Sequence, residues 1–205
     1  MIEIRLAELS DAPRIGEILV EGFMNKFGPI FGRKVDRAPG IVARMMAREI
    51  RQDDAALFVA QVANRVVGVL KLHTRQDTPG DILFGLRLFL REVGPFYTVR
   101  AMIGLLLLHE EPAADEGYIS EIAVAAAHRG QGIGWELLRQ AERWATAHDK
   151  TYLSLHVAET NRARVLYERF GFRAAGTVRP WLAERLFGIR SWIYMVKPIL
   201  HTSEV

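Results

Sequence analysis

The sequence predicts an α/β fold in which a mixed sheet is flanked by helices. Runs that alternate apolar and polar residues, the period of a strand, are interspersed with runs in which apolar residues recur at helical spacing. After the first strand and its helices the order is two strands, an insertion, and then β-α-β-α-β-β, which indicates a mixed sheet. Half of the residues are hydrophobic and a quarter are charged, so we expect one globular domain over residues 1–205.

The first third of the chain predicts a strand, two helices and a hairpin. Residues 2–6 alternate apolar and charged side chains, as in a half-buried strand. Ser10 or Asp11 is expected to cap the next helix, whereas FGPIFGRK (27–34) is expected to form a loop. A second helix is predicted at about 40–51. Residues 57–74 then form two β-rich runs that are joined at Ala63-Asn64-Arg65.

The second half predicts strands and helices in alternation. A strand is expected at 118–124, a strongly amphipathic helix at 132–148 and a strand at 152–157. A short helix at 161–170 and closing strands at 172–178 and 189–196 complete the order. The insertion at about 78–117 lies between the third and fourth strands, and most of it is expected to be helical.

Composition excludes several classes of protein. The chain has no cysteine, which excludes disulfides, a thiolate zinc site and a cysteine nucleophile. A net charge of +3 without a long basic block gives no support for nucleic-acid binding, and the scattered histidines predict no metal site. We see no signal peptide, and the longest charge-free apolar stretch of the insertion, residues 101–108, is far short of the ~20 residues of a membrane span. We therefore expect a cytoplasmic protein.

The stretch HRGQGIG, residues 128–134, is a candidate phosphate-binding loop between a strand and a helix. Glycines allow the backbone to approach an anion, and a helix start offers unpaired N–H groups and the positive end of the helix dipole. The loop has no Gly-Lys pair and so is not a nucleoside-triphosphate loop. It is also a poor dinucleotide fingerprint, because Trp135 stands where the third glycine belongs.

At this loop the sequence resembles the GNAT superfamily of N-acetyltransferases. RGQGIG (129–134) matches the family signature [QR]-x-x-G-x-[GA] at every fixed position, although Ala126 stands where many members have proline. The strand SEIAV precedes it, and the strand LSLHV and the string NRARVLYERFGF (161–172) follow it, as in the family. The resemblance implies a GNAT fold, whose mostly antiparallel sheet splays between strands four and five, here with a helical insertion between strands three and four.

The resemblance also implies a set of cofactor-binding residues. The pyrophosphate of acetyl-CoA is expected on the backbone N–H groups of the loop, and Val124 offers its backbone to the pantetheine arm as an extra strand would. Asn161 is expected both to cap its helix and to contact the cofactor. The complete predicted set is Ile122, Val124, Arg129, Gly130, Gln131, Gly132, Ile133, Gly134 and Asn161, with no metal.

Two side chains are candidate catalytic residues. Glu121 would lie in a central strand, with Ile119 and Ala123 on the same face. An isolated charge there lowers folding stability, so its presence suggests a function. It is a candidate base for the acceptor amine, and the alternative is an ion pair with an arginine. The resemblance implies that Tyr167 protonates the departing CoA thiolate; the alternative is a core aromatic. We expect His156 to be a satisfied sheet residue rather than a proton relay.

These residues predict transfer of an acetyl group from acetyl-CoA to a primary amine by direct attack. The rival hypothesis is a non-catalytic acyl-CoA-binding sensor or interaction module, which has no need of Glu121 or Tyr167. The acceptor, a small molecule or a peptide amine, is left open. Trp181 is a further candidate residue for the acceptor pocket.

The insertion raises a separate question, because apolar residues cover most of the circumference of ILFGLRLFLREV (82–93). Exposed in full, they would form a patch too large to leave in water. We expect the insertion to form a lid over the acceptor site or a homodimer interface. Contact with a membrane surface, through Arg87, Arg91 and Arg100, ranks third.

Overall fold

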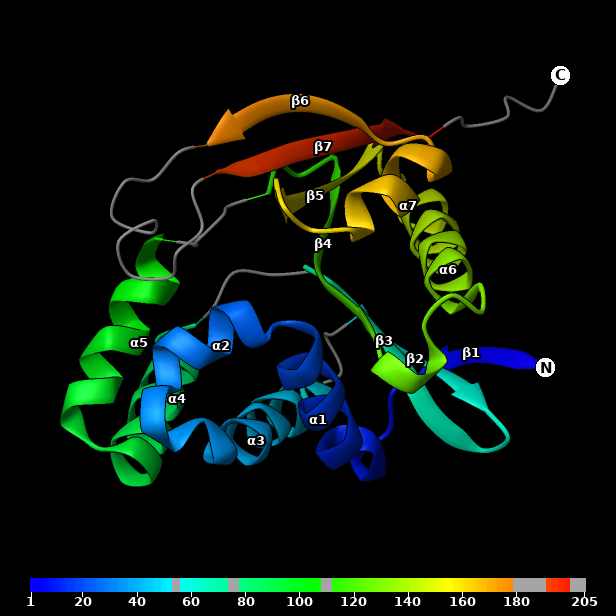
Figure 1. Cartoon of the computed structure of the whole chain (residues 1–205). Coiled ribbons are helices and arrows are strands. Elements are labelled where there is room, and N and C mark those ends of the chain that lie inside the picture. Colours follow the sequence, from blue (N-terminus) through cyan, green and yellow to red (C-terminus); the bar gives the residue numbers. More distant parts are fainter. Residues whose placement is uncertain (53–55, 74–77, 108–111, 179–190, 200–205) are drawn as a thin grey trace, which may run out of the picture.

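A computed structural model describes residues 1–52, 56–73, 78–107, 112–178 and 191–199, and these contain one seven-stranded sheet (Figure 1). The strand order is β1-β2-β3-β4-β5-β7-β6, and only β4 and β5 pair in parallel. The predicted mixed, mostly antiparallel sheet is therefore confirmed. The strands are β1 (Ile2–Leu6), β2 (Ala56–Val62), β3 (Arg65–Leu72), β4 (Glu116–Val124), β5 (Tyr152–Ala158), β6 (Arg173–Val178) and β7 (Trp192–Pro198).

Helices cover both faces of the sheet. In Figure 1 the first five lie together on one side, and the last two lie on the other. They are α1 (Ala12–Gly22), α2 (Met24–Phe31), α3 (Ala38–Arg51), α4 (Pro79–Val93), α5 (Pro95–Leu107), α6 (Ile133–Ala147) and α7 (Ala163–Phe170). Two hydrophobic clusters follow this division. One joins α1–α5 to the sheet, and the other joins α6 and α7 to its opposite face.

The segment that the sequence predicts as a loop, FGPIFGRK, is largely helical, so that prediction was wrong. It forms the end of α2, followed by a 3-10 helix over Gly32–Arg37, although Pro29 lies inside α2. Phe27, Ile30 and Phe31 recur at helical spacing and are all buried. Burying two phenylalanines and an isoleucine outweighs the unfavourable helix propensities of Gly28 and Pro29.

The insertion forms a hairpin of α4 and α5, and the hairpin packs on the N-terminal helices. The ring of Phe89 in α4 stacks on Phe31 of α2 at 5.4 Å between centroids, and Ala101 of α5 is fully buried in the same cluster. Arg48 of α3 donates to Asp81 at the start of α4 over 2.8 Å. The hairpin is thus part of the main core, and its inner face needs no second molecule to cover it.

A membrane span was not expected, and the described residues contain no helix that is both long and apolar enough to cross a bilayer. α4 and α5 have 15 and 13 residues, and Gly94, with a φ of +82°, breaks the chain between them.

The Phe31–Phe89 contact leads to a stability prediction. We expect Phe89→Ala to lower the free energy of unfolding by about 3–5 kcal/mol, because it opens a cavity in a closed core. Phe96→Ala is the matched control, because the Phe96 side chain on α5 is 72% exposed, and it should change stability by less than about 0.5 kcal/mol. Urea denaturation measures both. Equal losses would show that the hairpin does not pack as described.

Candidate active site

The parallel strands β4 and β5 separate soon after they begin. Their pairing covers only Glu116–Ile119 against Tyr152–Leu155. Beyond that point β4 stays paired with β3 as far as Val124, while β5 stays paired with β7 as far as Ala158. The predicted splay between strands four and five is therefore present, and along it no described strand pairs with the facing edges of β4 and β5.

A bulge at Ser120 marks the place where the strands separate. The β3–β4 register shifts between Lys71 and Leu72, and the Ser120 hydroxyl donates to the Lys71 carbonyl over 3.2 Å. Because one residue is inserted, the side chains on either side of it alternate out of phase. Ile119 joins the core under α6, whereas Ala123 joins the core under α1–α3. The expectation that Ile119 shares a face with Glu121 and Ala123 was therefore wrong for Ile119.

The open edge of β4 presents backbone groups of Ile122 and Val124. The Ala125 N–H donates to the Val67 carbonyl of β3 over 2.9 Å. In an antiparallel pair every second residue bonds to the partner strand, so the N–H and C=O groups of Ile122 and Val124 point away from β3. The Val124 carbonyl, on that open side, accepts a hydrogen bond of 3.0 Å from Nε of Arg129. The geometry is that of a strand edge ready to receive an extended ligand.

The glycine loop presents a run of free donors at the end of this edge. None of the five backbone N–H groups from Gly130 to Gly134 donates a hydrogen bond to a described residue. Gly130 and Gly132 have φ values of +75° and +81°, and a Cβ at either would meet nothing within 4 Å. The loop is therefore both exposed and shaped for close approach, and α6 adds the positive end of its dipole.

Within the loop, Ile133 and Gly134 have a second, structural role. The Ile133 side chain is 1% exposed and lies in the core, so only its backbone can reach a ligand. A Cβ on Gly134 would come within 2.9 Å of Leu166 on α7. The glycine at this position thus permits close packing of α6 on α7, in addition to leaving its N–H free.

Asn161 was predicted to cap α7, but the N-cap residue is Arg162, which makes no side-chain cap hydrogen bond. Asn161 lies one residue earlier and contacts the start of the helix. Its side-chain oxygen accepts a hydrogen bond of 2.9 Å from the N–H of Ala163, the first residue of the helix. That oxygen is therefore engaged in fixing the start of α7.

Tyr167 lies on the inner face of α7, and its ring packs against Phe172. The side chain is 6% exposed, and its hydroxyl makes no hydrogen bond to any described residue. Burial raises the pKa of the phenol above its usual value near 10. The phenol is therefore protonated throughout the neutral range, and its hydroxyl has no structural hydrogen bond to break.

Glu121 is a half-buried carboxylate without a cation. Within the described residues it has no salt bridge or hydrogen bond, and Oε2 is wholly buried. Lys71, its Cα partner on β3, places its ammonium group 2.8 Å from Glu49 of α3. The predicted alternative, an ion pair between Glu121 and an arginine, does not occur among these residues. Burying this oxygen without a hydrogen-bond partner costs folding free energy, which favours a functional role.

A second buried carboxylate, Glu116 at the start of β4, was missed by sequence reasoning. It is 8% exposed and accepts hydrogen bonds from the hydroxyls of Ser154 and Tyr194, the latter at 2.8 Å, and from the Ala113 N–H at 2.9 Å. Burial and the Glu116 charge raise the pKa of Tyr194. The donors come from β5, β7 and the preceding turn, so no local sequence pattern could have predicted this network.

His156 lies on the same face as that network. Its ring is 5.9 Å from Tyr118 and 4.9 Å from Tyr194, centroid to centroid, and the Tyr118 hydroxyl is 3.4 Å from its Nδ1. These contacts support the interpretation of His156 as a packed sheet histidine. Trp181, the guess for the acceptor pocket, lies outside the described residues.

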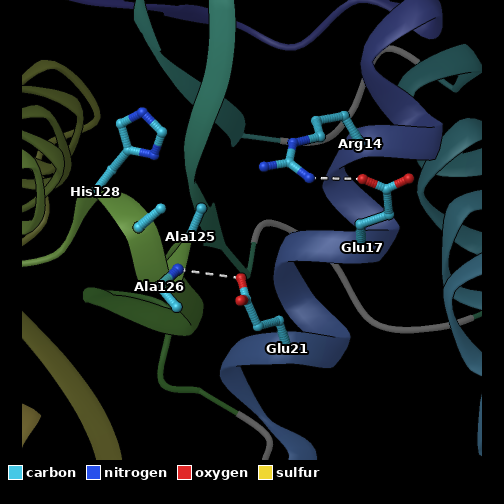
Figure 2. Close-up of a pocket in the computed structure, with 7 residues that line it drawn as sticks. Arg14, Glu17, Glu21, Ala125, Ala126 and His128 are labelled. Atoms are coloured by element: carbon cyan, nitrogen blue, oxygen red, sulfur yellow. Dashed lines mark hydrogen bonds and ion pairs between the residues drawn. The ribbon is translucent and has the colours of Figure 1, made fainter.

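A shallow pocket of about 300 Å³ lies between α1 and the segment that leads into the glycine loop (Figure 2). Glu21 of α1 accepts a hydrogen bond of 3.1 Å from the Ala126 N–H, and Arg14 pairs with Glu17. Nδ1 of His128 is buried there and has no hydrogen-bond partner among the described residues. Figure 2 shows α1 and the loop segment side by side, so the first contact helps to fix where the loop begins. No cluster of residues in the described part of the chain is suited to hold a metal ion.

The family comparison agrees with this geometry. The sequence profile described as "Acetyltransferase (GNAT) family" matches residues 20–172, so the chain belongs to the GNAT acetyltransferase family. A search of curated protein sequences finds no match.

Solved structures show the same fold at low sequence identity. A PaiA N-acetyltransferase from Thermoplasma acidophilum, in complex with coenzyme A, has a TM-score of 0.63 at 15% identity and covers 97% of this chain and 99% of its own. The ribosomal-protein-S18-alanine N-acetyltransferase of Escherichia coli has a TM-score of 0.57 at 18% identity, and the match covers 100% of this chain and 97% of that protein. YncA of Salmonella typhimurium, a putative acetyltransferase with acetyl-CoA, has a TM-score of 0.60 at 14% identity, and the match covers 100% of this chain and 98% of that protein.

The Glu116 network gives a prediction with a matched control. Tyr194→Phe removes one donor from a buried carboxylate and should lower the free energy of unfolding by about 1.5–3 kcal/mol. Tyr167→Phe removes a hydroxyl that has no partner and should leave stability unchanged within about 0.5 kcal/mol. Thermal and urea denaturation test the pair. A Tyr194→Phe protein as stable as the wild type would show that Glu116 does not depend on this hydroxyl.

Proposed function

We propose that the protein transfers an acetyl group from acetyl-CoA to a primary amine. The observation that carries the proposal is the run of five unpaired backbone N–H groups, from Gly130 to Gly134, at the end of an open strand edge. A diphosphate needs several convergent donors, and a pantetheine arm needs a free strand edge. The residues present therefore fit CoA in both charge and shape.

Bound acetyl-CoA supplies an activated acetyl thioester, and the chain supplies its position. The loop N–H groups would hold the pyrophosphate, while Ile122 and Val124 would hold the pantetheine arm along β4. Arg129 and Gln131 are exposed beside the loop and add polar side chains there. Asn161 contributes by fixing the start of α7, which carries Tyr167. Holding the reactants in the reactive orientation in this way would supply a large part of the rate acceleration.

Glu121 and Tyr167 divide the proton transfers between them. Glu121 is the proposed general base and accepts the proton that the amine nitrogen loses as it attacks the carbonyl carbon. Tyr167 is the proposed general acid and donates a proton to sulfur as the carbon–sulfur bond breaks. The unpaired state of both side chains supports these roles, and the reaction needs no covalent intermediate on the protein.

Tyr167→Phe tests the general acid. We expect turnover to fall by roughly 100-fold while CoA affinity is unchanged, because the variant loses only a proton donor. Since the phenol pKa is raised, the wild-type rate should show no loss from Tyr167 ionisation below about pH 10. CoA release, followed with a thiol reagent over a panel of amines, measures the rate. Turnover within twofold of the wild type would remove Tyr167 from the mechanism.

Glu121→Gln tests the general base, with Glu3→Gln on the exposed face of β1 as the control. The Glu121 variant should lose roughly 100-fold in rate at neutral pH. The rate of this variant should approach that of the wild type as the pH rises toward about 10, because a lysine-like amine then deprotonates in solution and needs no general base. The control should follow the wild type at every pH. A constant rate ratio across this range would contradict a base role.

A non-catalytic CoA-binding module is the other candidate. Tight CoA binding without release of CoA for any amine, in the wild-type protein, would favour it. The unpaired carboxylate of Glu121 argues against a pure binding module, because CoA binding at the glycine loop does not require a carboxylate at this position.

A further inference from the structure

The outer face of the α4–α5 hairpin exposes an unusual number of large apolar side chains. Phe96 and Val99 of α5 are 72% and 60% exposed. On α4 the side chains of Ile82, Leu83 and Leu90 are also exposed. The inner face of the hairpin is already covered by α2 and α3, so these residues are left over after the core is complete. In Figure 1, α5 forms the edge of the molecule that lies farthest from α6.

Arginines are interleaved with these apolar residues. Arg87 lies four residues after Leu83, three before Leu90 and four before Arg91, so it neighbours all three on one side of α4. Arg87 and Arg91 are exposed and make no salt bridge or hydrogen bond with described residues.

The acidic side chains of the hairpin do not offset this charge. Asp81 pairs with Arg48 and Glu92 pairs with Arg44, both on α3. The exposed face of the described hairpin therefore combines apolar and cationic groups and has no exposed carboxylate.

The helices around the hairpin extend the positive charge. Residues 24–52 and 78–107, which form α2 to α5, hold ten lysines and arginines and four acidic residues. Their net charge of +6 exceeds the +3 of the whole chain, so the remainder of the protein is net acidic. The described helices α2 to α5 thus form a cationic layer that carries the exposed apolar tip.

We propose that this surface, residues 82–99 of the hairpin, binds the anionic surface of a phospholipid bilayer. Large apolar side chains insert between headgroups, and arginines pair with the phosphates around them. A second copy fits less well, because a twofold contact through this face would bring Arg87 and Arg91 close to the same cations of the partner. This proposal does not depend on the acetyl-transfer chemistry.

The test is co-sedimentation of the full-length protein with vesicles of phosphatidylcholine alone and with phosphatidylserine added. We expect binding only to the anionic vesicles, and weaker binding as salt screens the charges. Arg87→Gln with Arg91→Gln should lower the partition coefficient by roughly 30-fold, about fivefold for each charge. Phe96→Ser with Val99→Ser should lower it by at least tenfold.

Matched controls lie across the sheet. Arg139→Gln with Arg143→Gln, both exposed on α6, should bind as the wild type does, and so should Leu6→Ser on β1, whose side chain is 60% exposed. The proposal is overturned if anionic vesicles do not bind the protein, or if the control variants lose as much affinity as the hairpin variants. It is also overturned if light scattering shows a dimer that becomes a monomer in Phe96→Ser with Val99→Ser.

Discussion

The parallel pairing of β4 and β5 ends after four residue pairs, and the candidate site depends on that short contact. A longer ladder would satisfy the backbone groups of Ile122 and Val124, and no strand edge would be left for a ligand. The bulge at Ser120 makes the divergence possible, because it lets β4 follow β3 while β5 follows β7. It also turns Glu121 toward the α1–α3 face. One inserted residue therefore sets both the open edge of β4 and the direction of the candidate base.

Two further features act at the ends of this opening. The glycine loop lies at one end with N–H groups that no described residue accepts from. α7, whose start Asn161 contacts, carries Tyr167 in the same hydrophobic cluster as Leu155 and Val157 of β5. At the other end, Glu116 gathers hydroxyls from β5 and β7 where the strands are still paired. Glu116 accepts several hydrogen bonds, whereas Glu121 and the Tyr167 hydroxyl have no hydrogen-bond partner among the described residues. The structure thus separates groups that hold the sheet together from groups that are available for chemistry.

The sequence predicted the parts of this site that depend on neighbouring residues. The glycine loop, the contact of Asn161 with the start of α7 and the position of Tyr167 in its helix all follow from local spacing. The face of Ile119 was predicted wrongly because a bulge is set by pairing with β3, which strand alternation cannot reveal. α2 was missed because the burial of Phe31 against the distant Phe89 outweighs the local effect of Pro29. The partners of Glu116 come from strands 38 and 78 residues away, so they also required the fold.

The most direct test of the account is whether the unpaired N–H groups bind the cofactor. Two-dimensional ¹H–¹⁵N NMR during a titration with CoA reports each backbone amide separately. We expect the largest downfield shifts at residues 130–134, because their protons gain a charge-assisted hydrogen bond to phosphate, with smaller shifts at Ile122 and Val124. Saturable CoA binding that leaves the amides of residues 130–134 unmoved, or that shifts mainly the arginine-bearing helices α3 and α4, would contradict the central claim.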